Sequence, residues 1–217
     1  MELLELMKSR HSVRSYLDTP IEEEKRIVLN KLIDEINTKA NLHIQIVYDD
    51  NKCFDSFLAH YGKFTGVNNY IALVGEKRND LEETLGYYGE EIVLKAQELG
   101  LNTCWVALTH GKSKAVINKN EKQVCLITIG YGKTSGVSHK IKTIEEVSNY
   151  KENMPEWFLN GVNAALLAPT AMNQQKFYFQ LQNDETVKIT RKSGFYTKLD
   201  LGIVKYHFEA IAKKITV

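Results

Sequence analysis

The sequence lacks the features that mark membrane and nucleic-acid-binding proteins. No apolar run approaches the ~20 residues that a membrane-spanning helix needs, and no secretory signal pattern opens the chain. The net charge is only +1, so no strong global field favours nucleic acid. We therefore expect a protein that binds neither a membrane nor nucleic acid.

Cysteine is scarce, and histidine lacks the spacing of a metal site. Cys53, Cys104 and Cys125 are odd in number and widely separated, which indicates reduced core residues of a cytoplasmic protein rather than a disulfide framework or a metal centre. The six histidines include no H-x-x-x-H pair. Cys104 could be a nucleophile, but a buried cysteine in a strand is inert by default.

Glycine motifs for nucleotides are missing as well. The chain contains no G-x-G-x-x-G fingerprint of a dinucleotide-binding domain. Residues 132–134 (GKT) imitate the end of a G-x-x-x-x-G-K-[ST] phosphate loop, but Ile127 stands where the first glycine is required, and loop-like residues follow. A nucleoside triphosphatase is therefore not expected.

What the sequence does contain is an alternation of helical and strand patterns, which predicts an α/β (α+β) fold. At 217 residues, with ordinary hydrophobic and charged fractions, the chain can form one domain or two small ones. Helices are expected over 21–37, 80–99, 156–167 and 198–214, and strands over 43–48, 69–75, 102–108, 123–129, 177–181 and 186–189. Gly100 should end the second helix.

The order of these elements repeats. Helix, strand, strand and long helix over residues 21–99 return on a smaller scale after Pro155, which suggests two units, 1–150 and 151–217. Any α/β chain can show such a coincidence, and the pattern alone leaves that alternative open.

Two distant segments carry the polar groups of a candidate binding site. Residues 10–14 (RHSVR) place two guanidiniums and a hydroxyl together, which are donors suited to phosphate. Residues 168–175 (APTAMNQQ) offer a proline bend, a hydroxyl and three carboxamides, which suit the amide edge of a heterocycle. Taken alone, the first could be a solvated basic turn, and the second a helix end that runs into a loop.

Together the two segments resemble the flavin-binding motifs of the nitroreductase family, R-x-S-x-R and A-P-S-x-x-N-x-Q-P-W, and the similarity extends over residues 2–214. In ordinary members the second motif lies between the first long helix and the first strand, and the two motifs meet across a homodimer interface. Residues 37–41, at that place, lack the motif. The chain therefore resembles the branch in which one polypeptide, with two tandem sheet-plus-helix units, mimics the family dimer.

The resemblance implies that FMN is the cofactor and that residues 10–14 bind it. Arg10 and Ser12 would hold the phosphate and ribityl end, His11 belongs to the same motif, and Arg14 would approach the pyrimidine end of the flavin. Residues 100–108 resemble the family's G-L-G-T-C segment, after which a backbone N–H faces the flavin N5. Ala107 or Leu108 would hold that position.

The second half would supply the other side of the site. Lys140 and Lys142 resemble the family's K-x-R pair, which binds phosphate. Gln175 is expected to brace the loop rather than bind the flavin. Residues matching the flavin loop itself are Pro169, Thr170, Ala171 and Asn173, with Asn173 either contacting the flavin or only capping the loop. Lys176-Phe177 stands where the family has P-W, and Ala171 where serine is common, which weakens any inference about substrate shape.

The implied function is an FMN-dependent oxidoreductase that moves hydride from NADH or NADPH to flavin N5 and on to a nitroaromatic, quinone or flavin acceptor. The lack of an obvious acid, base or nucleophile agrees with chemistry that the cofactor carries. Two alternatives stay open, a flavin-binding or flavin-storing protein without turnover and a structural domain that has lost the ligand. We expect one FMN per chain and a protein that can be monomeric.

Overall fold

The structure is a computed structural model that describes residues 2–183 and 185–216. The chain divides into two compact units built from interleaved segments. Arg10–Leu81 and Ile92–Ser138 form what we call the sheet unit, and Met1–Ser9, Glu82–Glu91 and His139–Val217 form the helical unit. The repeat predicted from the sequence concerns consecutive segments, 1–150 and 151–217, and it stays a prediction.

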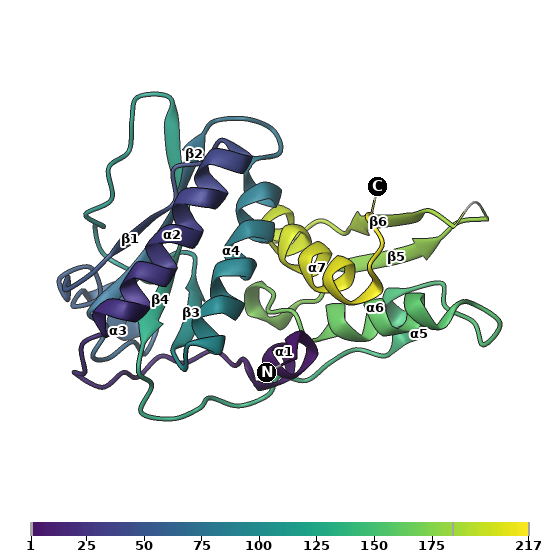
Figure 1. The fold of residues 1–217 in the computed structure, drawn as a ribbon, viewed down its shortest axis with the longest axis horizontal. Helices are drawn as coiled ribbons and strands as arrows, with labels where there is room; N and C mark the ends of the chain where they lie inside the picture. The colour runs from purple at the N-terminus through teal and green to yellow at the C-terminus, as the bar shows by residue number, and fades with distance from the viewer. Residues whose placement is uncertain (1, 184, 217) are drawn as a thin grey trace. The chain divides into compact units, whose positions relative to one another are not determined.

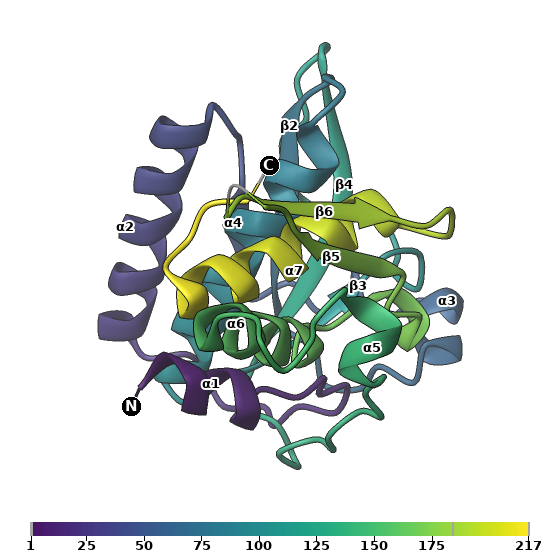
Figure 2. The same cartoon turned by 90° about the vertical axis from the view of Figure 1, so that its right-hand side faces the viewer.

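The sheet unit is built on four antiparallel strands in the order β1-β2-β4-β3, and the two central strands explain its core. The strands are β1 (Gln45–Val47), β2 (Asn69–Glu76), β3 (Asn102–Val106) and β4 (Glu121–Gly130). β2 is buried along all but its last residue, so both faces of the sheet centre must be covered. Helix α2 (Glu23–Ala40) runs beside the sheet in both views (Figures 1 and 2).

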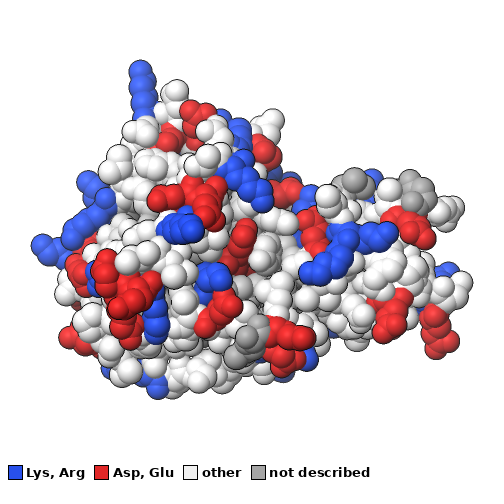
Figure 3. Space-filling model, in the orientation of Figure 1, with Lys and Arg blue, Asp and Glu red and all other residues white. Residues whose placement is uncertain are grey.

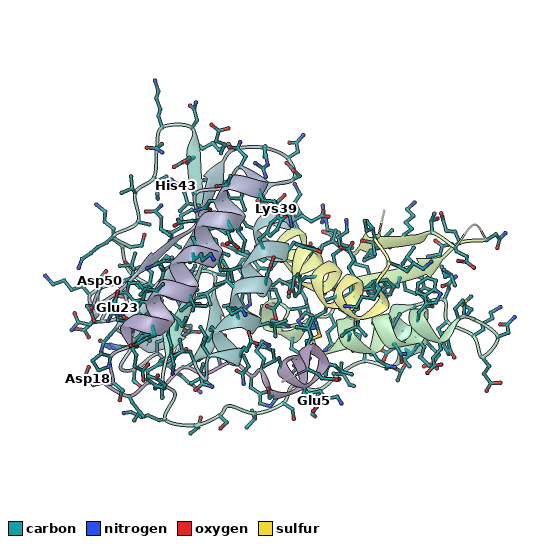
Figure 4. The ribbon with its side chains drawn as sticks, in the orientation of Figure 1. Glu5, Asp18, Glu23, Lys39, His43 and Asp50 are labelled. Atoms are coloured by element: carbon teal, nitrogen blue, oxygen red, sulfur yellow. The ribbon has the colours of Figure 1, made fainter. Side chains whose placement is uncertain are left out.

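One side chain fixes how α2 joins the sheet. Asn37, near the end of α2, donates from Nδ2 to the Ile44 carbonyl at 2.8 Å and accepts from the Ile44 N–H at 2.8 Å. This paired contact satisfies the backbone of Ile44 just before β1 begins. His43 and Asp50, labelled in Figure 4, lie on either side of β1 along the chain. The short helix α3 (Phe57–Tyr61) follows before β2.

The helical unit packs α6 (Glu156–Leu166) against α7 (Thr197–Ala212) and adds the hairpin of β5 (Phe177–Leu181) and β6 (Val187–Arg191), as Figure 2 shows. It also contains α1 (Leu3–Ser9), α5 (Ile144–Val147), the 3₁₀ turn η1 (Ala171–Asn173) and residues 82–91 of α4 (Leu81–Glu98). Phe179 of β5 stacks on Phe208 of α7 with ring centroids 4.6 Å apart.

A close backbone approach joins α7 to residues 82–91. A Cβ added at Gly202 would stand 1.9 Å from the Glu83 carbonyl oxygen, and one added at Gly86 would stand 2.1 Å from the Leu199 carbonyl oxygen. Only glycine at both positions permits these two helices to touch backbone to backbone.

The four helices and six strands predicted from periodicity are confirmed, with ends shifted by up to three residues. α4 ends at Glu98, and Gly100 follows in the left-handed conformation at φ +76°, as expected. The strand expected over 102–108 ends at Val106, so Ala107 and Leu108 lie beyond it. The short helices α3 and α5 were not predicted, because neither is long enough to show a helical period.

The state of the cysteines and the distribution of surface charge agree with what the composition predicted. All three cysteines are free and buried, which confirms that they are reduced core residues. Positive and negative side chains are interspersed on the face drawn in Figure 3. Among the described residues, no helix has the length and apolar character to cross a membrane.

Candidate functional site

Residues 10–17, which we call the clamp segment, are extended and fixed through their backbone within the sheet unit. The Val13 N–H donates to the Thr103 carbonyl of β3 at 3.0 Å. Farther along, the Thr65 N–H donates to the Arg14 carbonyl at 3.0 Å, and the Tyr16 N–H donates to the Thr65 carbonyl at 2.9 Å. Main-chain bonds therefore set the course of this segment.

The side chains of the clamp segment divide into a core set and a polar set. Val13 and Tyr16 are each 2% exposed and pack into the core under the sheet. Arg10 is also buried, Ser12 is half-buried, and Arg14 is exposed with its guanidinium 5.9 Å from the centre of the Phe64 ring. The donors that the sequence predicted for phosphate are therefore held by an anchored backbone.

The electrostatics of Cys104 and His11 show how closely the cations gather. Burial raises the pKa of the Cys104 thiol, and Arg14, Ser12 and Arg10 oppose that shift. The thiol stays protonated at neutral pH, which supports its expected inertness. Burial and the charge of Arg10 lower the pKa of His11, so its ring is neutral at pH 7.

A glycine brings the following loop onto the clamp segment. Gly136 has φ +75°, and a Cβ there would stand 2.7 Å from the His11 Cβ and 3.1 Å from the Ser12 carbonyl oxygen. The backbone at Gly136 therefore lies directly against residues 11–12, where no larger residue would fit.

Ala107 and Leu108 directly follow β3, the strand whose Thr103 carbonyl accepts from Val13 of the clamp segment. Leu108 is 61% exposed.

The chain beyond Leu108 is held by hydrogen bonds that lead to Asp50, a buried residue that the sequence did not single out. The Lys114 N–H donates to the Tyr70 hydroxyl at 2.8 Å, and that hydroxyl donates to Asp50 Oδ2 at 2.8 Å.

Asp50 is 2% exposed, and Lys114 Nζ lies 3.1 Å from its Oδ1. Burial of Asp50 acts to raise the pKa of its carboxyl, but Tyr70 and Lys114 more than offset this, and the pKa is lowered. In the sequence Asp50 belongs to a D-D-N turn, and such turns are usually solvated, so no signal marked it.

A cavity of about 500 Å³ lies beside the clamp segment in the sheet unit. This volume falls within the range of small-molecule sites. Its lining includes the aromatic residues Tyr16, Phe54 and Phe64 and the charged residues Asp18, Asp55 and Lys133. From the clamp segment, Tyr16 and Leu17 line this space, whereas Arg10, Ser12 and Arg14 do not.

Loop 168–175, in the helical unit, has a strained backbone. Met172, Asn173 and Gln175 have φ of 54°, 52° and 44°, in the left-handed region that non-glycine residues rarely adopt. Such residues cost on the order of 1–3 kcal/mol each and persist where their surroundings fix them, often at ligand sites. The Met172 side chain is 89% exposed.

The structure brings residues 140–142 onto this loop, so the two sequence-predicted segments of the helical unit lie together. Lys142 Nζ donates to the carbonyls of Gln174 and Gln175 at 3.1 and 2.9 Å. Asn173 Nδ2 donates to the Lys140 carbonyl at 2.8 Å. The Lys142 ammonium therefore supports the loop, whereas the Lys140 side chain is exposed.

Gln175 and Asn173 complete the bracing of the loop. Gln175 is 3% exposed, and its Nε2 donates to the Lys140 carbonyl at 2.8 Å and to Asn173 Oδ1 at 2.9 Å. Its Oε1 accepts from the Lys142 N–H at 2.9 Å. The expectation that Gln175 braces the loop is confirmed. Both ends of the Asn173 amide are engaged within this network, as its capping alternative requires.

Two further contacts come from Thr170, which the sequence predicted as a flavin-loop residue, and from Asp200, which it did not single out. The Thr170 hydroxyl accepts from the Gln175 N–H at 3.1 Å. Asp200 on α7 accepts from the Ala171 N–H at 2.9 Å and from Gln174 Nε2 at 2.8 Å. Among the described residues, no group of three His, Cys, Asp or Glu side chains could hold a metal ion.

Comparison with known families and structures gives a consistent result. A family model described as "Putative TM nitroreductase" matches residues 2–212. The structure of a "putative nitroreductase" from Thermotoga maritima is similar with a TM-score of 0.69 and 24% identity, over 99% of this chain and 87% of that one. A search of curated proteins finds no match.

Shorter relatives share part of the fold. A "putative nitroreductase" from Desulfovibrio desulfuricans, solved in complex with FMN, is similar with a TM-score of 0.52 and 18% identity. The match covers 71% of this chain and 99% of that one. A nitroreductase family protein from Clostridium difficile gives a TM-score of 0.51 and 19% identity, over 70% of this chain and 99% of that one. At these identities the likeness concerns the fold.

Proposed function

Since the chain belongs to the nitroreductase family, we propose that it is an FMN-dependent oxidoreductase that uses NADH or NADPH to reduce a nitroaromatic, quinone or flavin acceptor. The observation that carries the proposal is the clamp segment, in which Arg10, Ser12 and Arg14 lie on an anchored backbone. The names of two relatives are in line with it. One is described with FMN, and one, from Parabacteroides distasonis, as an NADH dehydrogenase/NAD(P)H nitroreductase.

The donor chemistry of this chain fits a flavin phosphate. Arg10 and Ser12 offer charge-assisted and neutral donors for a dianion. Arg14 would stabilise negative charge at the pyrimidine end, and a backbone N–H of Ala107 or Leu108 would face N5. When bound, FMN supplies the hydride and electron chemistry, while the protein supplies grip and orientation.

In the helical unit, Lys140 would provide a further cation for the phosphate, and the flavin loop would consist of Pro169, Thr170, Ala171 and Asn173. Lys142 and Asn173 would contribute through the bracing of that loop. The two halves of the site would then come from one chain, as in the tandem branch of the family. Residues 153–156 carry no R-x-S-x-R counterpart, so a second site should be degenerate.

The colour of the purified protein tests the function directly. We expect a yellow protein with oxidised-flavin absorbance that bleaches when NADH or NADPH is added without oxygen. A yellow protein that no nicotinamide bleaches would be a flavin-binding or flavin-storing protein. A colourless protein that takes up no added FMN would contradict the flavin proposal altogether.

Replacing one guanidinium tests the clamp. Arg10→Ala should weaken FMN binding by about 1.5–3 kcal/mol, because a charge-assisted contact to the phosphate is lost. Flavin fluorescence titration measures the affinity. Lys119→Ala removes an exposed cation of the same unit and should leave the affinity unchanged. If the two variants bind FMN equally well, Arg10 is not part of the site.

Stoichiometry tests the tandem proposal. We expect one FMN per chain and a monomer in dilute solution. Light scattering combined with flavin quantitation measures both. A dimer that loses its flavin on dissociation would show that the motifs meet between chains.

A further inference from the structure

A carboxylate outside both sequence motifs grips the strained loop at two points. Asp200 lies in the first turn of α7 and is 5% exposed. Its Oδ1 accepts from the Ala171 N–H at 2.9 Å, and its Oδ2 accepts from Gln174 Nε2 at 2.8 Å. The two donors stand immediately before and after Met172 and Asn173, two of the left-handed residues of the loop.

The other contacts of the loop come from outside α7 or from the loop itself. Lys142 holds the carbonyls of Gln174 and Gln175, which lie at the far end of the loop. Gln174 Nε2 also donates to the Phe195 carbonyl at 2.6 Å, so its amide is fixed toward α7. The Thr170 hydroxyl links the two ends of the turn from within the loop, because it accepts from the Gln175 N–H. Asp200 holds both ends from α7, because it accepts from the Ala171 N–H and from Gln174 Nε2.

We propose that Asp200 is a positioning residue that holds loop 168–175 in its strained conformation and releases it when the carboxylate is protonated. Its importance for the flavin rests on the proposed function, whereas its hold on the loop does not. A carboxylate accepts at both oxygens, but a carboxylic acid turns one of them into an O–H donor. Facing two N–H donors, the acid form loses one acceptor, so one end of the turn is freed.

The charge of Asp200 is governed by burial and by the loop itself. Burial raises the pKa of Asp200 to about 6, and the hydrogen bonds from Ala171 and Gln174 oppose that shift. Charged groups on the neighbouring segments have partners of their own. Lys142 Nζ donates to the loop carbonyls, and Lys176 Nζ donates to the Ser193 carbonyl at 3.0 Å. Glu83 of α4 forms an ion pair with Lys205, with Nζ and Oε1 2.6 Å apart. None of them contributes to the shift.

This arrangement makes loop order and overall stability respond to acid in opposite directions. Because the folded pKa exceeds the unfolded value of 3.8, the contribution of Asp200 to stability is full below that value and is lost as the pH rises through about 6. The hydrogen bonds to the loop are strongest above the folded pKa, when both oxygens accept. If Asp200 stays buried when the loop opens, losing the two hydrogen bonds that lower its pKa favours its protonation, so acid should loosen the loop without an Asp200-dependent loss of global stability.

Hydrogen exchange of the full chain between pH 5 and 7.5 tests the proposal. Corrected for intrinsic rates, exchange over residues 168–175 in the FMN-free protein should become about tenfold faster as the pH falls through 6. Asp200→Asn should show the faster exchange at every pH, because its Nδ2 opposes Gln174 Nε2. Glu83→Gln, which removes a carboxylate without loop contact, should keep the wild-type response. An unchanged pH response in Asp200→Asn would overturn the proposal.

A second variant and a second measurement complete the test. Gln174→Met keeps Asp200 but removes the side-chain donor, and it should also weaken the pH response; a full response would count against the proposal. FMN affinity then distinguishes the hold of Asp200 on the loop from the proposed role of the loop in binding FMN. If Asp200→Asn loosens the loop but binds FMN normally, the hold by Asp200 stands and the flavin role of the loop falls. If FMN binding weakens while the loop stays protected, Asp200 does not act through the loop.

Discussion

The clamp segment and loop 168–175 carry the two parts of the candidate site, and they are fixed by different means. Backbone bonds to Thr103 and Thr65 hold the clamp segment, and none of its residues has a positive φ. Side chains hold the loop, which contains three left-handed residues. In the clamp segment, polar side chains can therefore serve a ligand. In the loop, most polar side chains form hydrogen bonds that hold the loop itself. Its backbone and exposed atoms are therefore the groups that can contact a ligand.

The largest effect is expected where the backbone packing of the clamp segment is broken. Gly66 has φ +67°, and a Cβ there would stand 2.4 Å from the Tyr16 carbonyl oxygen. Gly66→Ala should cost about 3 kcal/mol of unfolding free energy, from backbone strain and the clash together. Urea denaturation measures the change.

Gly100→Ala is the matched control for this variant. Gly100 has φ +76° and nothing within 4 Å of an added Cβ, so alanine there should cost about 1 kcal/mol from strain alone. Equal losses in the two variants would mean that the contact with Tyr16 contributes nothing.

A smaller effect is expected when a side chain that supports the loop is removed. Lys142→Met keeps the length of the side chain but loses the charged donor to the Gln174 and Gln175 carbonyls, and it should cost about 2 kcal/mol of stability. Lys140→Met should leave stability unchanged and weaken FMN binding. Thermal unfolding and FMN titration of both variants measure this difference. The reverse pattern would assign Lys142 to the phosphate and Lys140 to the loop.

The smallest effect is expected at Asn173. Asn173→Leu loses the contacts with the Lys140 carbonyl and with Gln175, which should cost about 1 kcal/mol with or without FMN. Calorimetry with and without FMN measures it. A variant that unfolds like the wild type but binds FMN more weakly would instead place the Asn173 side chain on the flavin.

The elements that could be predicted are those in which burial leaves a long pattern. β2 and β4 are continuous apolar runs because the centre of a covered sheet admits no polar face. The candidate motifs were found because their residue types suit phosphate and amide partners. Within each unit the structure places matching segments together, residues 10–14 near β3 and residues 140–142 on loop 168–175.

What could not be predicted are contacts between positions with no shared pattern. Asp200 looks like one polar position of an amphipathic helix, and nothing in its spacing indicates that its carboxylate turns toward Ala171. Spacing indicated the residue type at Lys142 but could not fix the direction of its flexible ammonium, which donates to the Gln174 and Gln175 carbonyls. Asp50 was hidden for a similar reason, since its burial depends on Tyr70 and on the loop beyond β3.

The placement of the cysteines makes the thiols a reporter for one part of the molecule. All three are buried, all three belong to the sheet unit, and burial raises the pKa of Cys53 to about 11. An alkylating reagent should therefore react with these thiols only when the sheet unit opens, so the alkylation rate measures the frequency of that opening. Local unfolding of the helical unit should leave the alkylation rate unchanged. The native protein should accordingly withstand oxidants that damage exposed thiols.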